Sequence, residues 1–153
     1  MNQKLIVLLF GLLVAAISCT PKVTVDKDKA LVDSLLTAYD VLWNCQDPAK
    51  ALTMWADDGI MMFQDQVDIS GKDSLLAFCN LHVPNLRNFT SIRGDFAVNN
   101  DLITINSMYS FEYLGGDQVL YPNKGIALQY AKKQPDGTWK LVLGVYHQAF
   151  VVK

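Results

Sequence analysis

The sequence predicts an α+β domain in which three N-terminal helices pack on an antiparallel sheet. Between residues 29 and 83, apolar side chains recur every three or four positions, the spacing of helices that bury one face. Between residues 89 and 152, long strand-like segments alternate with short turn-forming sequences, as in consecutive hairpins. Helices followed by hairpin-connected strands favour the α+β class, with the helices on one face of the sheet.

Length and charge favour one globular domain. The chain has 153 residues, 51% of them apolar, and a formal net charge of −2. A chain of this length buries enough surface for a single core. The sequence contains no run of Lys and Arg, no Gly-rich phosphate loop and no Cys/His group with metal-ligand spacing. We therefore expect no nucleic-acid partner, no cofactor and no metal.

The N-terminus is typical of a bacterial lipoprotein precursor. Lys4 precedes the apolar stretch Leu5–Ile17, which has the length of a signal peptide and falls short of the roughly 20 residues of a membrane span. The sequence at 16–19, Ala-Ile-Ser-Cys, resembles the lipobox at which lipoprotein signal peptidase cuts. We predict a signal peptide over residues 1–18 and a lipid on Cys19. An uncleaved membrane anchor is the alternative.

The predicted lipid would hold the domain in the cell envelope. Residues 19–28 are expected to be the lipidated Cys and a polar tether, and residues 29–153 the folded domain. Thr20 follows the Cys, in place of the Asp that commonly retains lipoproteins in the inner membrane. We therefore expect the outer membrane, where several acyl chains anchor a protein more firmly than one.

The helical segments have recognisable starts and ends. The first helix is expected over residues 29–45. Asp47-Pro48 can start a short second helix, because Asp accepts from exposed N–H groups and Pro fits the first helical position. Trp55 would lie on the inner side of this helix. A third helix is expected to start at Asp73-Ser74 and to stop before Pro84.

Five strands are expected. Turn-forming sequences at Asn99-Asn100, Gly115-Gly116 and Pro135-Asp136-Gly137 separate the last four of them. The predicted strands are residues 60–66, 89–98, 102–114, 119–133 and 138–152.

Several short sequence words occur in the order typical of one protein superfamily. They are Tyr39 in the first helix, Asp47 at the helix–helix turn, Trp55-Ala56-Asp57-Asp58 before the first strand, Gly71 before the third helix, and Asp136-Gly137-Thr138-Trp139-Lys140-Leu141 at the last hairpin. From residue 29 onward the chain resembles the nuclear transport factor 2-like superfamily, in the branch of ketosteroid isomerases and SnoaL-like cyclases. The resemblance implies a cone-shaped, cystatin-like roll with a curved sheet. It does not fix a function, because this superfamily includes enzymes, ligand binders and interaction modules.

The resemblance also implies where isomerase residues would lie. Ketosteroid isomerases use a tyrosine and a protonated aspartic acid as an oxyanion hole, and an aspartate as the base. Tyr39 falls at the tyrosine position, Gln129 at the position of the acid and Phe63 at that of the base. Because Phe63 cannot accept a proton, we do not expect steroid isomerisation.

A ligand pocket is expected between the helices and the sheet. Trp43 lies one helical turn from Tyr39, and both would form its wall. Strict alternation from Trp139 along the last strand predicts that His147 points inward. The predicted pocket residues are Tyr39, Trp43, Trp55, Phe63, Gln129 and His147.

Acid/base catalysis would need a partner for His147. Asp65 shares a strand face with Phe63, and Glu112 is the other candidate. Each carboxylate also fits a solvated surface position. His82, at the end of the third helix, is expected to contact the helix terminus rather than to act in catalysis.

Apolar side chains also gather on one face of the middle strands. The two sets are Tyr109, Phe111 and Tyr113 on one strand and Ile126, Leu128 and Tyr130 on the next. If this face is outside, it is the kind of patch that marks a partner surface. The resemblance implies dimerisation through the outer sheet face, so we expect a homodimer. This assignment weakens if Glu112 and Gln129 point outward instead.

The two remaining cysteines, Cys45 and Cys79, permit two interpretations. An oxidising envelope allows a disulfide between them. Two buried free thiols are the interpretation we favour, because both residues fall on helical patterns and nothing in the sequence fixes their separation.

Three functions are compatible with the sequence. The first is an envelope-anchored binding module for a small, largely apolar molecule. The second is an acid/base enzyme, isomerase- or cyclase-like, that uses His147 with Asp65 or Glu112. The third is an interaction module that uses the outer sheet face. We favour the binding module, because the catalytic positions of the isomerase are not kept.

Overall fold

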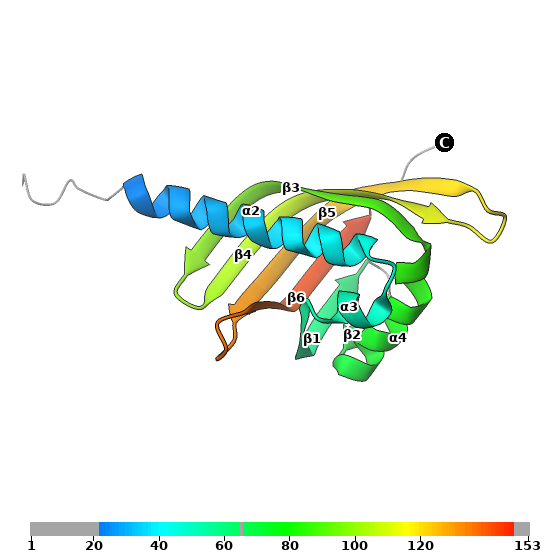
Figure 1. Cartoon of the computed structure of the whole chain (residues 1–153), viewed down its shortest axis with the longest axis horizontal. Coiled ribbons are helices and arrows are strands. Elements are labelled where there is room, and N and C mark those ends of the chain that lie inside the picture. Colours follow the sequence, from blue (N-terminus) through cyan, green and yellow to red (C-terminus); the bar gives the residue numbers. More distant parts are fainter. Residues whose placement is uncertain (1–21, 65, 149–153) are drawn as a thin grey trace, which may run out of the picture.

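The computed structural model describes residues 22–64 and 66–148, and in these ranges three helices and a short 3-10 turn accompany a six-stranded sheet (Figure 1). The α+β class is the one that the sequence predicts. The elements are α2 (Lys22–Asn44), α3 (Pro48–Leu52), β1 (Trp55–Phe63), β2 (Ile69–Ser70), α4 (Lys72–His82), η1 (Val83–Asn85), β3 (Leu86–Asn99), β4 (Leu102–Leu114), β5 (Leu120–Lys133) and β6 (Trp139–Gln148). None of the described helices is long and apolar enough to cross a membrane. The predicted signal peptide, Cys19 and Asp65 lie outside the described residues.

The strands follow the order β2-β1-β6-β5-β4-β3 in the sheet. Three hairpins join β3, β4, β5 and β6, which pair antiparallel as expected. The prediction of a wholly antiparallel sheet is wrong at one place, because β1 pairs parallel with β6. The chain leaves β1 through β2 and α4 before it enters β3, and this long connection brings β1 and β6 side by side in the same direction (Figure 1).

Several element boundaries differ from the prediction, and the short strand β2 was not predicted. Two of the differences concern segments that were given a role. Helix α2 begins at Lys22, so residues 22–28, predicted as tether, are helical. That segment has no Pro or Gly that would stop a helix. Trp55 lies in β1 rather than on α3, because α3 ends at Leu52 and Trp55 pairs with Leu141 of β6.

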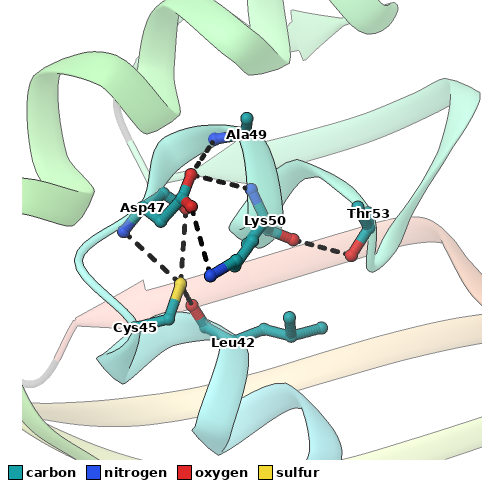
Figure 2. A network of polar contacts seen from close by, with 6 residues as sticks. All are labelled: Leu42, Cys45, Asp47, Ala49, Lys50 and Thr53. Carbon is teal, nitrogen blue, oxygen red and sulfur yellow. Dashed lines mark hydrogen bonds and ion pairs between the residues drawn. The ribbon is translucent and has the colours of Figure 1, made fainter.

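The predicted cap of α3 is present (Figure 2). The Asp47 carboxylate accepts hydrogen bonds from the backbone N–H groups of Ala49 and Lys50, each at 3.1 Å. These bonds, above all the one from Lys50, hold the pKa of Asp47 below its usual range. Beside the cap, the Cys45 thiol donates to the carbonyl of Leu42 at 2.9 Å. The cap fixes the turn by which the chain reverses from α2 toward β1.

The core fills the space between the helices and one face of the sheet. Burial along β4 alternates strictly: Ile103, Ile105, Ser107 and Tyr109 are buried, and the residues between them are exposed or half-exposed. From α2 the core receives Val32, Leu36, Tyr39 and Trp43. We call the sheet face that meets these helices the inner face, and the opposite one the outer face.

Helix α2 is fastened to the edge strand β3 by side-chain hydrogen bonds. The Asn44 amide donates to the carbonyl of Phe89 and accepts from its N–H, both at 2.8 Å. The Asp40 carboxylate accepts from the N–H and the hydroxyl of Ser91, at 2.9 and 2.7 Å. Arg93 pairs with Asp33 farther along the same helix. These contacts satisfy backbone groups of β3 that face away from β4.

We expect Asn44→Ala to lower the free energy of unfolding by about 1–3 kcal/mol, because it leaves two backbone groups of Phe89 without their partner. Urea denaturation followed by circular dichroism measures the change. Thr37→Ala is the matched control, since Thr37 lies exposed on the same helix and bonds only within it. Its effect should stay within about 0.5 kcal/mol. Equal unfolding midpoints for Asn44→Ala and the wild type would contradict this account.

Candidate functional site

A pocket of about 460 Å³ opens between α4, the end of α2 and the inner face of the sheet. Apolar and aromatic residues make up most of its lining: Trp43, Met61, Phe63, Phe78, Leu86, Phe89, Tyr109, Phe111, Tyr113, Tyr121 and Tyr146. The polar lining residues are Gln66, His82, Asn123 and Gln148. Its volume lies within the range of small-molecule sites.

Two sets of stacked rings form opposite sides of this pocket. The first, which we call the β4 wall, consists of Trp43, Phe89, Tyr109 and Phe111, with neighbouring ring centroids 5.8–6.1 Å apart. The second, the α4 wall, consists of Phe63, Phe78 and His82. Tyr146 joins them, since it stacks on Phe63 at 5.4 Å and meets Tyr109 edge-on at 5.9 Å. Such contacts hold each ring in place and leave the walls preformed.

The pocket is uncharged within the described part of the chain, where no Asp, Glu, Lys or Arg lines it. Its one imidazole belongs to His82, at the last position of α4. Burial lowers the pKa of His82 below its usual value, so the ring is neutral at neutral pH. Burial likewise raises the pKa of Tyr109 and Tyr146, whose phenols keep their protons. The site therefore offers hydrogen bonds without formal charge.

Several buried side chains with polar atoms lie close to Tyr146. The Gln129 amide donates to the Tyr146 hydroxyl at 3.4 Å. Among the described residues, three buried polar atoms have no hydrogen-bond partner: the Tyr39 hydroxyl, Trp55 Nε1 and Gln129 Oε1. Gly144 makes room for this packing, because a Cβ there would lie 2.7 Å from the Tyr146 ring and 2.8 Å from the Trp55 ring.

Of the six predicted pocket residues, two line the pocket and three are buried without lining it. The sixth, His147, is exposed. Trp43 and Phe63 are part of its lining. The predictions for Tyr39, Trp55 and Gln129 were wrong in detail, since all three are buried but none is a lining residue. Gln129 reaches only the hydroxyl of Tyr146, whose ring occupies the end of the pocket.

The prediction that His147 points inward was wrong. Tyr130 pairs with Leu143 and Ala131 with Leu141, so β6 carries one extra residue, Val142, at this point. Such a bulge reverses which side chains face the core in the rest of the strand. Tyr146 is therefore buried and His147 is exposed on the outer face.

The carboxylates predicted as partners of His147 do not meet it in the described residues. Glu112 lies on the outer face of β4, where its carboxylate accepts a hydrogen bond from the Asn88 amide. Asp65 lies outside the described residues. The acid/base pair of His147 with Glu112 is therefore not assembled in the pocket.

The aromatic residues of β4 do not lie on the outer face, which the sequence analysis had considered for them, and Glu112 lies there instead. Tyr109, Phe111 and Tyr113 line the pocket, whereas Ile126 and Leu128 of β5 are exposed on the outer face. The sequence does contain a pattern that indicates the correct face. Tyr109 alternates with Ile103 and Ile105, two apolar residues that a strand covered on one side would bury. Sequence reasoning missed most of the lining, including Tyr146 and also His82, which was expected to contact a helix end.

Both remaining cysteines are free thiols in the described part of the chain, as we favoured, but only Cys79 is buried and Cys45 is half-buried. Burial, with the neighbouring Cys45 thiol, raises the pKa of Cys79 to about 11. A thiol with this pKa is scarcely ionised at neutral pH and is a poor nucleophile. Neither cysteine lines the pocket.

A second hollow, of about 470 Å³, lies at the opposite end of the sheet. Its lining mixes acidic and basic residues with apolar ones: Ala56, Asp58, Asp101, Lys132, Lys133, Gln134, Pro135 and Val142. It has no aromatic wall, and the charged residues around it are exposed. The aromatic pocket is the better-formed candidate site.

The architecture matches solved structures closely. No protein-family model matches the sequence, and no curated protein matches it. A ketosteroid isomerase-like protein from Erwinia carotovora superposes with a TM-score of 0.69 at 17% identity, over 79% of this chain and 95% of the other. A Salmonella enterica protein of the nuclear transport factor 2-like superfamily gives 0.68 at 13% identity, over 84% and 96%. The fold is nuclear transport factor 2-like.

A third neighbour agrees on the fold. A nuclear transport factor 2-like protein with a cystatin-like fold, from Novosphingobium aromaticivorans, gives a TM-score of 0.64 at 13% identity, over 86% of this chain and 88% of the other. Identities this low carry the fold alone. The nuclear transport factor 2-like architecture is thus established, and the function must be argued from the pocket.

We expect the stability of the protein to fall as the pH drops below about 6.5, in part because of His82. The pKa of His82 is lower in the folded than in the unfolded chain, so protons bind preferentially to the unfolded state. This stabilisation is fully present above the pKa that His82 has in the unfolded chain. It is lost as the pH falls through the lower pKa that His82 has in the folded protein. Urea midpoints at pH 7.5 and 5.5 measure it.

In His82→Phe the fall between these two pH values should be smaller than in the wild type. His147→Gln is the control, because His147 is exposed and makes no contact with the pocket. If His82→Phe and the wild type lose the same stability on acidification, the burial of a neutral His82 is wrong.

Proposed function

We propose that the chain is an envelope-anchored lipoprotein whose domain binds a small, largely apolar molecule in the aromatic pocket. The observation that carries this proposal is a preformed space of about 460 Å³ between two walls of stacked rings. Binding sites for small molecules typically combine such a lining with a few polar groups that orient the ligand. Here those groups are His82, Tyr113 and the amides at the pocket mouth.

The absence of a charged pair favours binding over acid/base catalysis. General acid/base chemistry needs a titratable group within about 3 Å of the proton that moves, often with a second group to set its protonation state. Among the described lining residues His82 is the sole imidazole and has no carboxylate beside it. The pairing of His147 with Glu112 loses its support, because both residues lie on the outer face.

A homodimer through the outer face is a second part of the proposal. In neighbouring strands Ile92 pairs with Met108, and Met108 with Ile126. These three side chains are 62%, 55% and 53% exposed and form one apolar row across the sheet. Leu128 and Val145, also exposed, extend it toward β6. Burying such a row against a second copy removes apolar surface from water.

We expect the neutral probe N-phenyl-1-naphthylamine to bind the purified protein with enhanced fluorescence. Phe111→Glu should weaken this binding at least about tenfold, since a carboxylate in the β4 wall must be desolvated when an apolar ligand enters. Fluorescence titration gives the dissociation constants, and circular dichroism verifies the fold. Wild-type protein without probe binding, or Phe111→Glu with unchanged affinity, would overturn the binding proposal.

Met108→Glu is the matched control on the same strand. Met108 lies on the outer face, so the substitution should leave probe affinity unchanged. The substitution adds one carboxylate to the apolar row of each subunit, so two carboxylates would lie in the proposed dimer interface. The protein should therefore sediment as a monomer. A wild-type protein that sediments as a monomer would remove the dimer from the proposal without touching the pocket.

The lipid anchor is tested in the cell. Cys19→Ser removes the sulfur that would carry the lipid, so the protein should fail to incorporate radiolabelled palmitate. Autoradiography of the immunoprecipitated protein measures the label, and Cys45→Ser is the matched control that should incorporate it as the wild type does. Undiminished labelling of Cys19→Ser would contradict lipidation at this residue.

A further inference from the structure

We propose that His82 and Tyr113 form a hydroxyl-binding site at one side of the pocket, and that the ligand is an uncharged ring compound carrying a hydroxyl. This inference rests on the proposed binding function and names the class of molecule that the pocket selects.

The two side chains reach the pocket from different elements. His82 is the last residue of α4, and Tyr113 lies near the end of β4. The Tyr113 hydroxyl and His82 Nδ1 are 3.5 Å apart, with ring centroids 6.0 Å apart. A contact of 3.5 Å is at the outer limit of a hydrogen bond. Both groups therefore retain hydrogen-bonding capacity that a ligand oxygen can use.

Neighbouring rings hold the imidazole in place. The His82 ring packs on Phe78 with 4.3 Å between centroids, and Phe78 stacks on Phe63 at 5.4 Å. The imidazole is thus a member of the α4 wall. A flat ring lying between the α4 and β4 walls would bring a substituent on its edge toward His82 and Tyr113.

The chemistry of the pair suits a hydroxyl. A neutral imidazole has one acceptor and one donor nitrogen, and a phenol can both donate and accept. A ligand hydroxyl can therefore donate to His82 while it accepts from Tyr113. Burial favours the neutral form of His82, which is the form that accepts.

The lining disfavours charged ligands. An anion would enter an apolar space where, among the described lining residues, no Lys or Arg offsets its desolvation, and a cation would find no Asp or Glu. Polar residues lie toward the projecting end of β4 and β5, where Tyr121 and Asn123 line the pocket. The ring of the ligand would occupy the apolar part, and its hydroxyl the polar side.

Matched naphthalene derivatives test this inference by displacement of N-phenyl-1-naphthylamine from the purified protein. Naphthalene supplies the ring alone, 2-naphthol adds a hydroxyl, and 2-naphthoate adds a charge. We expect 2-naphthol to displace the probe at about tenfold lower concentration than naphthalene, the gain of one good hydrogen bond. Hydrophobic burial alone would favour naphthalene, because it is the more apolar of the two.

Variants assign the preference to the two residues. His82→Phe keeps a ring on Phe78 but removes the acceptor, so the ratio of the displacing concentrations of naphthalene and 2-naphthol should fall to about one, whatever the absolute affinities. Tyr113→Phe should reduce the advantage about threefold or more. His147→Gln, on the outer face, should retain it in full.

The outcomes separate this inference from the binding proposal. If naphthalene and 2-naphthol displace the probe equally, the hydroxyl site is overturned and the pocket stands. If 2-naphthoate is the strongest of the three, the restriction to uncharged ligands is overturned. If the probe itself does not bind, the binding function has failed, and with it the ligand class. The ligand comparison uses the wild-type protein, so it holds even where a variant fails to fold.

Discussion

The attachment of α2 to the edge strand β3 is the contact on which the pocket depends. Asn44 and Asp40 satisfy the backbone groups of Phe89 and Ser91 that no strand pairs with. Exposed groups of this kind are a template for unwanted pairing, and the helix covers them. The same contact sets Trp43 against Phe89, at 5.8 Å between ring centroids, and so completes the β4 wall. Burial raises the pKa of Asp40, while its two bonds from Ser91 oppose that rise and favour the carboxylate. Directional hydrogen bonds, together with the burial of the apolar face of α2, thus fix where the helix crosses the sheet.

A single extra residue decides which side chains of β6 face the ligand. Residues 102–114, predicted as a strand, are the bounds of β4 in the structure, and the class and order of elements also follow from the sequence. The orientation of His147 does not follow from the sequence, because alternation along a strand predicts which face a side chain occupies only where the strand pairing is regular. The bulge at Val142 arises from how β6 pairs with β5 and leaves no mark in local sequence. The parallel pairing of β1 with β6 is likewise a long-range property that a local pattern cannot reveal.

The residues that line the pocket could be predicted only in part, because the lining also depends on contacts between distant parts of the chain. Trp43 and Phe63 could be placed from helical spacing and family resemblance. Tyr39, Trp55 and Gln129 are buried as expected but do not line the cavity, and Gln129 reaches only the hydroxyl of Tyr146, which does line it. The position of the Tyr146 ring requires glycine at 144, because a Cβ there would lie 2.7 Å from this ring and 2.8 Å from that of Trp55. The shape of the pocket follows from the close packing of the side chains around it, and it changes when one of those side chains changes.

Strand β4 contributes both to the charge-free pocket and to the apolar row on the outer face. Its inner residues contribute aromatic rings to the pocket wall, and Met108 on its outer face contributes to the apolar row. A strand alternates strictly, so each position serves one face alone, and a change on one side leaves the other chemically intact. The inner face of β4 is occupied mainly by apolar and aromatic residues and carries no carboxylate. The one carboxylate of the strand, Glu112, lies on the outer face beside Asn88. The imidazole of the pocket therefore comes from another element, because His82 lies at the end of α4, where it meets Tyr113 of β4.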